Sequence, residues 1–447
     1  MDKNMDLFEN APIPKAVLKN VIPSIVSMIM VLLYNLADTF FIGQTKNAYM
    51  VASVSVATPV FLLFMAIGML FGIGGTSLIS RTLGEQKYEK AKHISSFCFW
   101  TGLGVGIVGL ILIWVLMDVI CGAIGTSKET VGYVREYLGI VAFGIPFLVL
   151  SNAFSNILRA EGKATLAMLG MIVGNLMNIV LDPIMILGFG WNVKGAAVAT
   201  VIGNISAASI YVGHYIFGKS LLSIRLKDYS VKERIVGGVF AIGIPASLNS
   251  IMMSTSNIVV NNLMNHHGDM AVAGLGVSIK VNMVAVMLLI GLGTGIQPLL
   301  GYCYGAGKRE RYKGIMKFSL LLAVCMSVVM SLICYLGAKP MVNAFLTETE
   351  ALENGISFAR ILIISGPILG VLFVMINAIQ SMGAMLPSLV LSLSRQGIIY
   401  IPVLLTMNAV FQTKQALVAA QPTADYLATI LSVILFIGTF RHYFGKA

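Results

Sequence analysis

The chain repeats itself: two long apolar halves align at a nearly constant separation of 221 residues. Ala52-Ser53-Val54-Ser55-Val56 matches Ala273-Gly274-Leu275-Gly276-Val277, and three glycines of the first half recur in the second, where Gly72, Gly74 and Gly84 become Gly293, Gly295 and Gly305. A membrane unit that is used twice is typical of transporters, because two similar lobes can rock about a site that lies between them.

The composition indicates a helical membrane protein, since 57% of the 447 residues are hydrophobic and only 11% are charged. Backbone groups in lipid must be hydrogen-bonded within the spanning segment, so we predict an all-α polytopic fold with twelve transmembrane helices in two six-helix lobes. The expected spans are about 15–43, 50–80, 94–117, 131–160, 163–188, 193–217, 235–264, 270–302, 314–337, 352–381, 387–410 and 415–440.

A polar stretch near the middle of the chain predicts the division into lobes. We expect an N-terminal lobe over 1–217, a cytoplasmic linker over 218–234 and a C-terminal lobe over 235–447. Residues 1–10 are polar and acidic, and they do not resemble a cleavable signal peptide. No phosphate-binding loop of the Walker type is present in the sequence, so nothing in it indicates nucleotide-driven pumping.

The net charge of +11 is distributed unevenly. Lysines and arginines gather in the connections after the second, sixth and eighth spans, as in 308–317, whereas the opposite connections carry single lysines. This asymmetry predicts a multi-pass protein of the cell inner (plasma) membrane with both termini in the cytoplasm. The basic excess indicates contact with anionic lipid, and we expect no nucleic-acid partner.

Two aspartates stand out inside predicted spans, where an ionised carboxylate costs roughly 2.5–3.5 kcal/mol on the insertion scale. Asp182 shares one helix face with Asn175 and Asn178, and Asp38 shares a face with Asn35. If the two faces meet, they form a pocket that can hold a proton or Na⁺. The alternative is that each acid is a structural group, or lies near an outer helix end in water.

The second half does not repeat these acids. The counterpart of Asp38 falls in 257–261, and that of Asp182-Pro183 is Ile401-Pro402. We therefore assign ion coupling to the first lobe. Three acids near outer helix ends are interpreted as interfacial, namely Asp118, Glu136 and Asp425. Two cations of the second lobe, Arg360 and Arg395, are interpreted as snorkelling or as stabilising helix ends. Lys280 is equally compatible with a substrate-facing role.

Several residues are candidates for roles in substrate binding or bending. Methionines and amides of the second lobe suit a cavity for varied organic ligands, although lipid-facing filler explains most methionines as well: Met253, Asn257, Asn261, Lys280 and Met287. Pro23 is a candidate hinge early in the first span. The five cysteines have no metal spacing, and we expect no metal site, catalytic residue or cofactor.

Taken in order along twelve spans, several short motifs resemble those of the multidrug and toxic compound extrusion (MATE) family, and within it the bacterial drug/cation antiporters of the DinF and MepA-like kind. They are Asp38-Thr39-Phe40-Phe41-Ile42-Gly43, Ile79-Ser80-Arg81-Thr82-Leu83-Gly84, Asn178-Ile179-Val180-Leu181-Asp182-Pro183, Gly195-Ala196-Ala197-Val198-Ala199-Thr200, Gln380-Ser381-Met382-Gly383 and Ser394-Arg395-Gln396.

The resemblance implies a V of two lobes that opens alternately to each side, with H⁺ or Na⁺ entry driving export of organic, often cationic, compounds. It places the coupling site at Asp38, Asn178, Asp182 and Thr200, with Asn152 as a weaker candidate. Asn35 and Asn175 join the weaker candidates through their helix faces. NorM-type members carry an acid on the seventh span, where this chain reads Ser250-Ile251-Met252-Met253-Ser254, so we do not expect a second-lobe Na⁺ site.

We hypothesise that cation binding at Asp38 and Asp182 lets the first span bend near Pro23 and expels the substrate. The small-molecule antiporter is expected to act as a monomer among membrane lipids. One alternative is a lipid or lipid-linked oligosaccharide flippase of related architecture. A membrane receptor or scaffold is a further alternative, but it leaves the duplication unexplained. An intramembrane enzyme is disfavoured, because no His-Glu or Ser-His pairing lies in the predicted spans.

Overall fold

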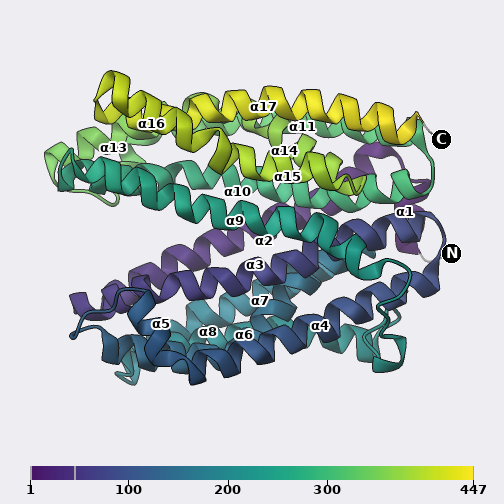
Figure 1. Ribbon diagram of the computed structural model, residues 1–447, viewed down its shortest axis with the longest axis horizontal. Coiled ribbons are helices and arrows are strands. Elements are labelled where there is room, and N and C mark those ends of the chain that lie inside the picture. Colours follow the sequence, from purple (N-terminus) through teal and green to yellow (C-terminus); the bar gives the residue numbers. More distant parts are fainter. Residues whose placement is uncertain (1–2, 45–46, 446–447) are drawn as a thin grey trace.

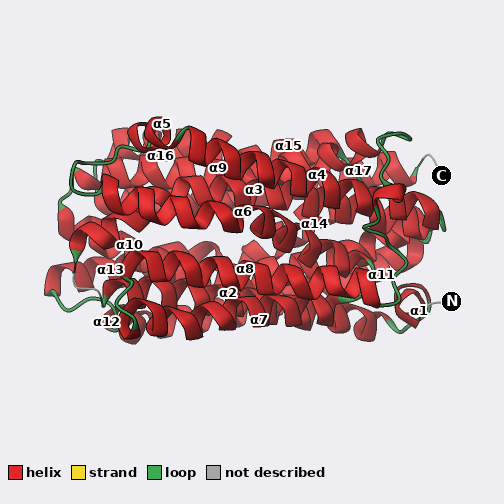
Figure 2. Cartoon of the chain, turned by 90° about the horizontal axis from the view of Figure 1, so that it is seen from below, coloured by secondary structure: helices red, strands yellow, loops and turns green. Residues whose placement is uncertain are grey.

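The computed structural model describes residues 3–44 and 47–445, and in these ranges the chain forms helices joined by short loops, without a strand (Figures 1 and 2). Twelve of the described helical segments are long and apolar enough to cross a membrane. The prediction of an all-α fold with twelve spans is therefore confirmed.

The spans of the first half are α2 (Ile13–Gly43), α3 (Ala48–Gly84), α4 (Tyr88–Val115), α6 (Val131–Ala160), α7 (Ala164–Pro183) with the π-helical turn η1 (Ile184–Gly188), and α8 (Asn192–Phe217). Those of the second half are α9 (Ile235–Asn265), α10 (Asp269–Gly305), α11 (Arg309–Leu336), α13 (Thr349–Leu362) with η3 (Ile363–Ser365) and α14 (Gly366–Ser381), α15 (Met385–Leu393) with η4 (Ser394–Ile398) and α16 (Tyr400–Phe411), and α17 (Lys414–Phe444).

The remaining elements are short and lie between spans: α1 (Lys3–Glu9), α5 (Met117–Ala123), η2 (Leu226–Asp228) and α12 (Ala338–Asn343). The sequence prediction missed them. The repeat is visible in the backbone, because α10 and α11 begin and end 221 residues after α3 and α4. α12 likewise begins 221 residues after α5.

Some predicted spans are too short at the end of the molecule that carries the termini. α4 begins at Tyr88 rather than near residue 94, and α11 begins at Arg309 rather than near residue 314. Both added turns carry a Glu–Lys pair three residues apart, as in Lys92 and Glu89, whose charged atoms lie 2.7 Å apart. Such pairs support exposed helix, so these helices continue beyond the apolar stretch that the prediction followed.

Helices α2–α8 pack together in one half of Figure 1, and α9–α17 pack together in the other. The halves meet where glycines allow two backbones to approach. Gly74 of α3 lies against Val239 and Gly243 of α9, and Gly295 of α10 lies against Val21 of α2. Gly305 of α10 and Arg81 of α3 make a similar contact. All of these contacts lie in the helix halves nearer the termini.

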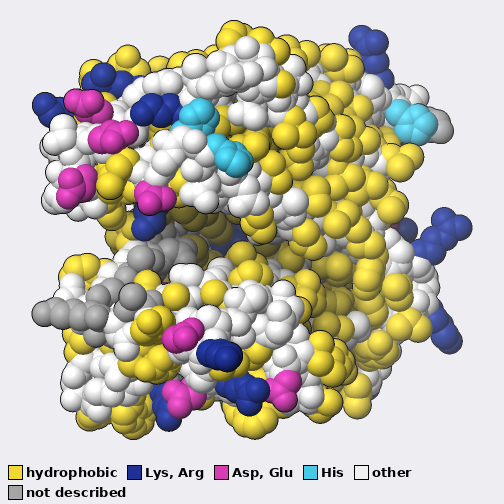
Figure 3. Space-filling view, turned by 60° about the vertical axis from the view of Figure 1, so that its left-hand side comes forward, with side chains coloured by type: hydrophobic (Ala, Val, Ile, Leu, Met, Phe, Trp, Pro, Cys, Tyr) yellow, Lys and Arg dark blue, Asp and Glu magenta, His cyan; other side chains and the backbone are white. Residues whose placement is uncertain are grey.

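At the opposite end the two halves separate, and the space-filling view shows the molecule hollowed between them (Figure 3). The outer parts of α2 and α9 carry exposed side chains there, including Leu33, Phe40, Met253 and Ile258. The structure is therefore closed at the end that carries the termini and open at the other end.

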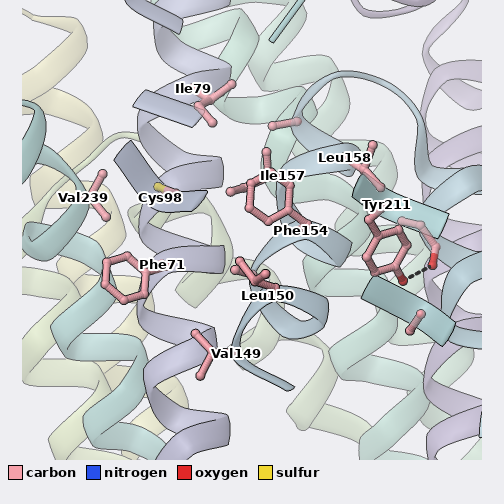
Figure 4. Close-up of a cluster of buried hydrophobic side chains, with 14 of the residues drawn as sticks. Phe71, Ile79, Cys98, Val149, Leu150, Phe154, Ile157, Leu158, Tyr211 and Val239 are labelled. Carbon is pink, nitrogen blue, oxygen red and sulfur yellow. Dashed lines mark hydrogen bonds between the residues drawn. The ribbon is translucent and has the colours of Figure 1, made fainter. Parts of the chain in front are cut away.

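A large apolar core fixes the helices of the first half (Figure 4). Phe71 of α3, Phe154 of α6 and Tyr211 of α8 are all buried in it. The Tyr211 hydroxyl donates to the carbonyl of Ala167 at 2.8 Å, and the Tyr211 ring covers Gly170 of α7. This ties α8 to α7, the helix that carries Asp182.

Candidate functional site

A polar cavity of about 120 Å³ lies inside the first half of the molecule. Five helices line it: α2, α3, α6, α7 and α8. Its polar lining consists of hydroxyls and amides: Tyr34, Asn35, Ser151, Asn152, Ser155, Asn175, Asn178, Thr200, Asn204 and Tyr211. Such a lining can solvate a small cation or a few water molecules away from lipid.

Two glycines set the distance between α7 and α8. A methyl group on Gly174 would lie 2.8 Å from the carbonyl oxygen of Gly203, and one on Gly203 would lie 2.7 Å from that of Gly174. Only glycine permits backbones to come this close. One turn further along α7, this packing places the side chains of Asn178 and Thr200 3.2 Å apart.

Asp182 lies four residues beyond Asn178 on the same face and is completely buried. With its amide oriented to suit both neighbours, Asn178 donates from Nδ2 to Asp182 Oδ2 at 2.8 Å and accepts from the Thr200 backbone N at 3.1 Å. Asp182 Oδ1 is buried without a hydrogen-bond donor, and Asn175 Nδ2 is buried without an acceptor. A carboxylate oxygen in this state suits a proton or a small cation.

Asp38 comes from α2, on the other side of the same region. Its side chain is half-buried, and its charge acts electrostatically on Asp182, Tyr34 and Tyr137. Tyr34 lies beside Thr200. The structure thus brings Asp38, Asn178, Asp182 and Thr200 into one neighbourhood.

The three weaker candidates, Asn35, Asn152 and Asn175, all line the cavity. Asn35 Nδ2 donates to the carbonyl of Val31 at 2.9 Å, and Asn152 Nδ2 donates to that of Leu148 at 2.9 Å. Their amide oxygens are the groups on which a role in cation binding depends. Among the described residues, no group of three His, Cys, Asp or Glu side chains forms a candidate metal centre.

Comparison with known proteins identifies the family, because the MatE family model matches the chain twice, over residues 23–184 and 245–406. The chain belongs to the MATE family. It is 31% identical over 414 residues to the multidrug export protein MepA of Staphylococcus aureus strain NCTC 8325, covering 92% of this chain and 90% of that protein. The MepA protein of Staphylococcus saprophyticus is 28% identical over 410 residues, with the same two coverages.

A solved structure described as the outward-facing conformation of a multidrug resistance MATE family transporter superposes on the whole chain with a TM-score of 0.93. It is 23% identical and is itself covered completely. The resemblance inferred from the motifs is therefore confirmed at the level of family and fold.

Five polar residues that line this cavity of the MATE chain were not among the sequence candidates. Tyr34 lies four residues before Asp38, Asn204 lies four residues after Thr200, and Tyr211 follows Asn204 by seven residues, so the helix spacing could have indicated all three. Ser151 directly precedes the candidate Asn152 on α6, and Ser155 follows it by three residues. Hydroxyls and amides near the candidates were the available signal.

The candidate substrate residues of this MATE chain lie outside the cavity of the first half. Met253, Asn257 and Asn261 are exposed on one face of α9, beyond its contacts with α3. On α10, Met287 is half-buried, and Lys280 is exposed with its ammonium 5.7 Å from the centre of the Phe345 ring. Phe345 follows α12 at the open end, so Lys280 lies towards the mouth of the molecule.

Pro23 is buried inside α2, which is helical from Ile13 to Gly43 without interruption. Nearby side chains bond back to the helix: Ser27 Oγ donates to the Pro23 carbonyl at 2.9 Å, and Ser24 Oγ donates to that of Asn20 at 2.9 Å. Asn20 Nδ2 donates to the Ala16 carbonyl at 3.0 Å. Such bonds accompany places where helices bend.

The interpretation of Arg395 and Asp425 as peripheral charges is wrong. Asp425 of α17 and Arg395 of η4 are both buried, with 1% and 8% of their surfaces exposed. Arg395 Nε lies 3.1 Å from Asp425 Oδ1. Asp425 lies well inside α17, where the aspartate and the arginine satisfy each other rather than reaching water. In contrast, Arg360 stays exposed against the Tyr335 ring, and Asp118 and Glu136 form exposed ion pairs with Arg135 and Lys194.

Proposed function

We propose that this MATE family protein is a secondary multidrug efflux antiporter. It couples entry of H⁺ or Na⁺ to export of organic, cationic amphipathic compounds by alternating access. The observation that carries this proposal is the environment of Asp182, a buried carboxylate with one unsatisfied oxygen, a cavity of amides beside it and the charge of Asp38 nearby. Beyond the coupling ion, the cycle requires no cofactor and no covalent chemistry.

The relatives support the direction of transport, because MepA is named a multidrug export protein. The open end of the molecule supports the order of events. We infer that a cation enters from the open side and reaches the buried Asp182 by way of the half-buried Asp38. Its binding neutralises two acids that otherwise repel each other in a low-dielectric region.

Neutralisation of Asp38 removes the need for the outer part of α2 to keep a charged carboxylate solvated. Once the charge of Asp38 is compensated, the outer part of α2 can pack more closely on the first half, with Pro23 as the bending point. The first-half side of the cavity then narrows and displaces the substrate outwards. The region around Pro23 is suited to this role, because it packs on Gly291 and Gly295 of α10 at the closed end. The described outer part of α2 makes no such glycine contacts.

Both termini are proposed to lie in the cytoplasm. The basic connections, including Lys308 and Arg311, are at the same end as the termini, and the positive-inside rule assigns that end to the cytoplasm. The open end then faces outwards. Reporter fusions after residues 217 and 447 should be active only with a cytoplasmic reporter; activity of an exported reporter at both positions would reverse the orientation.

Ethidium efflux from proteoliposomes, with pH and Na⁺ gradients imposed separately, tests the transport proposal. The wild-type protein should export ethidium under at least one gradient, and Asp38→Asn and Asp182→Asn should each lose that dependence. Asp118→Asn is the matched control, because Asp118 is an exposed acid paired with Arg135. Normal ion-driven efflux by both cavity variants would refute the proposal.

The flippase alternative predicts an unpaired cation deep in the cleft to hold a pyrophosphate. Among the described second-half candidates, Arg395 is held by Asp425, and Lys280 lies towards the mouth against Phe345. Neither arrangement favours a deep anion site. Lipid scrambling by the same proteoliposomes without ion-driven ethidium efflux would favour the flippase.

A further inference from the structure

A buried arginine lies against the first-half cavity, at the end away from Asp182 and its partner Asn178. Arg159 is the last but one residue of α6, and only 1% of its surface is exposed. Leu148, Ser151 and Ser155 line the cavity from α6. Arg159 follows Ser155 by four residues and therefore continues the same helix face towards the closed end.

The contacts of Arg159 place its guanidinium against the cavity wall. Nη2 lies 3.9 Å from the sulfur of Met171, which lines the cavity, and Nη1 donates to Asn156 Oδ1 at 3.0 Å. The charge of Arg159 also interacts with Tyr211, a second lining residue. Nε is buried without an acceptor.

In the described part of the chain, no carboxylate pairs with this guanidinium. The acid next along the chain is Glu161, which is completely buried, but its Oε1 accepts from Lys163 Nζ at 2.8 Å, from Ser220 Oγ at 2.7 Å and from the Leu221 backbone N at 2.8 Å. Lys163 also bonds His214 at 2.8 Å. This second layer closes the cytoplasmic end beneath Arg159 and adds no net negative charge to it.

Asp182 and Arg159 therefore lie beyond opposite ends of the cavity, each against a residue that lines it. Met171, beside Arg159, and Asp182 share one face of α7 and are separated by about 16 Å of helix. Hydroxyls and amides lie between them, so water or a cation could follow this path from Asp182 inwards. An uncompensated positive charge at the end of such a path repels cations and interrupts proton transfer along water.

We propose that Arg159 is a fixed positive charge that closes the cytoplasmic end of the first-half cavity to cations. Ions that reach Asp182 from the open side can then pass to the cytoplasm only when the central cleft changes its opening, which prevents their uncoupled passage. This role rests on the proposed antiport function. Arginine suits it better than lysine, because a guanidinium keeps its proton when buried, whereas a buried ammonium can lose its proton and pass it on.

The test measures passive H⁺ and Na⁺ entry into proteoliposomes without any drug, under an imposed gradient at about pH 4.5, below the pKa of about 5–6 that fully buried lysines can reach. Proteoliposomes with the wild-type protein should show little passive entry of either ion. Arg159→Gln should leak roughly tenfold faster or more, because a unit charge acts strongly over a short buried distance. Arg159→Lys should stay tight although it loses the fork-shaped contacts to Asn156. An additional Asp182→Asn substitution should reduce the leak of Arg159→Gln if the path runs through the cavity.

The variants separate a barrier from a structural role. Equal leaks in Arg159→Lys and Arg159→Gln would mean that packing, not charge, closes the cavity, and this would overturn the proposal. A tight Arg159→Gln protein with wild-type melting temperature would overturn it as well. Release of an encapsulated dye would also count against it, because a dye-sized hole is not a cation path. Failure of wild-type ethidium efflux refutes the antiport proposal separately, since the leak is measured without drug.

Discussion

Arg395 and Asp425 form a buried ion pair in the second half, with Nε 3.1 Å from Oδ1. Ser365 Oγ donates to Asp425 Oδ2 at 2.9 Å, and Gln421 Nε2 donates to Oδ1 at 3.1 Å. The acid of the second half is thus fully satisfied by fixed partners, whereas Asp182 of the first half keeps one oxygen free. Among the described residues, buried carboxylate oxygens without a partner therefore occur in the first half, where we propose the coupling site, and not in the second.

The first prediction concerns this ion pair. Asp425→Asn should destabilise the protein by about 3–5 kcal/mol, because it leaves the Arg395 charge buried without a counter-charge. Thermal unfolding in detergent measures the loss. The double variant Arg395→Met with Asp425→Leu should recover most of it, since apolar residues of similar volume replace both charges. A single variant as stable as the wild type would show that the pair does not hold the second half together.

Thr200→Val should weaken the dependence of efflux on the driving ion by about 10- to 100-fold, as loss of a partner that orients a ligand does at ion sites. Valine keeps the shape of the side chain but removes the hydroxyl that lies 3.2 Å from Asn178. The readout is the Na⁺ concentration or pH that gives half-maximal efflux. Ser206→Ala is the control, because this hydroxyl of α8 bonds only its own helix, at the Ile202 carbonyl. Equal shifts in both variants would argue against a specific role.

Much of the fold and part of the site follow from the sequence for local reasons. The spacing of Asn175, Asn178 and Asp182 predicts one helix face, and the duplication predicts the paired spans. Contacts between helices were harder to predict from the sequence. The approach of Asn178 to Thr200 depends on Gly174 and Gly203 packing between α7 and α8, and periodicity alone does not encode that packing; Thr200 entered only through the family resemblance.

The burial of charged side chains was the feature predicted least well from the sequence. Asp425 was interpreted as an interfacial acid, and Arg159, near the end of a predicted span, was not singled out. Their burial comes from neighbouring helices, through Met171 for Arg159 and Arg395 for Asp425. A hydropathy profile measures one segment at a time, and it therefore does not distinguish a charge near water from a charge covered by another helix.

Gly74→Ala should destabilise the conformation described above, closed at the end that carries the termini, because its methyl group would collide with the backbone carbonyl of Val239. Overpacking of this kind costs about 1–3 kcal/mol. We expect a lower melting temperature and slower efflux. Gly104→Ala is the matched control, since a methyl group there meets nothing within 4 Å and alanine favours helix. If both variants melt alike, the Gly74 contact does not maintain the closed end.

The last prediction concerns α1, which is bound to the second half at the closed end. Arg311 of α11 donates to three backbone carbonyls at and just after the C-terminal end of α1. They are those of Leu7 at 3.3 Å, Phe8 at 2.7 Å and Ala11 at 2.7 Å. Lys308 Nζ lies 2.7 Å from Glu9 Oε1. Arg311→Ala should raise hydrogen exchange of residues 3–11 by more than tenfold, because hydrogen bonds to a charged donor contribute about 1.5–3 kcal/mol each. Lys313→Ala, which breaks an exposed pair on the same helix, should leave the exchange unchanged.

The Glu9–Lys308 pair adds a pH dependence of defined sign. The hydrogen bond from Lys308 lowers the pKa of Glu9 below its ordinary value of 4.5. The pair therefore stabilises the docked α1 fully above that ordinary value, and the stabilisation is lost as pH falls through the lowered pKa. After correction for intrinsic rates, exchange of residues 3–11 should stay constant from pH 8 to about 5 and rise at lower pH. Glu9→Gln should remove the acid-dependent rise and exchange faster by only a few-fold at neutral pH, because partly exposed pairs contribute about 0.2–1 kcal/mol. A rise that persists in Glu9→Gln would assign the acid sensitivity to another group and leave Arg311 as the residue that holds α1 in place.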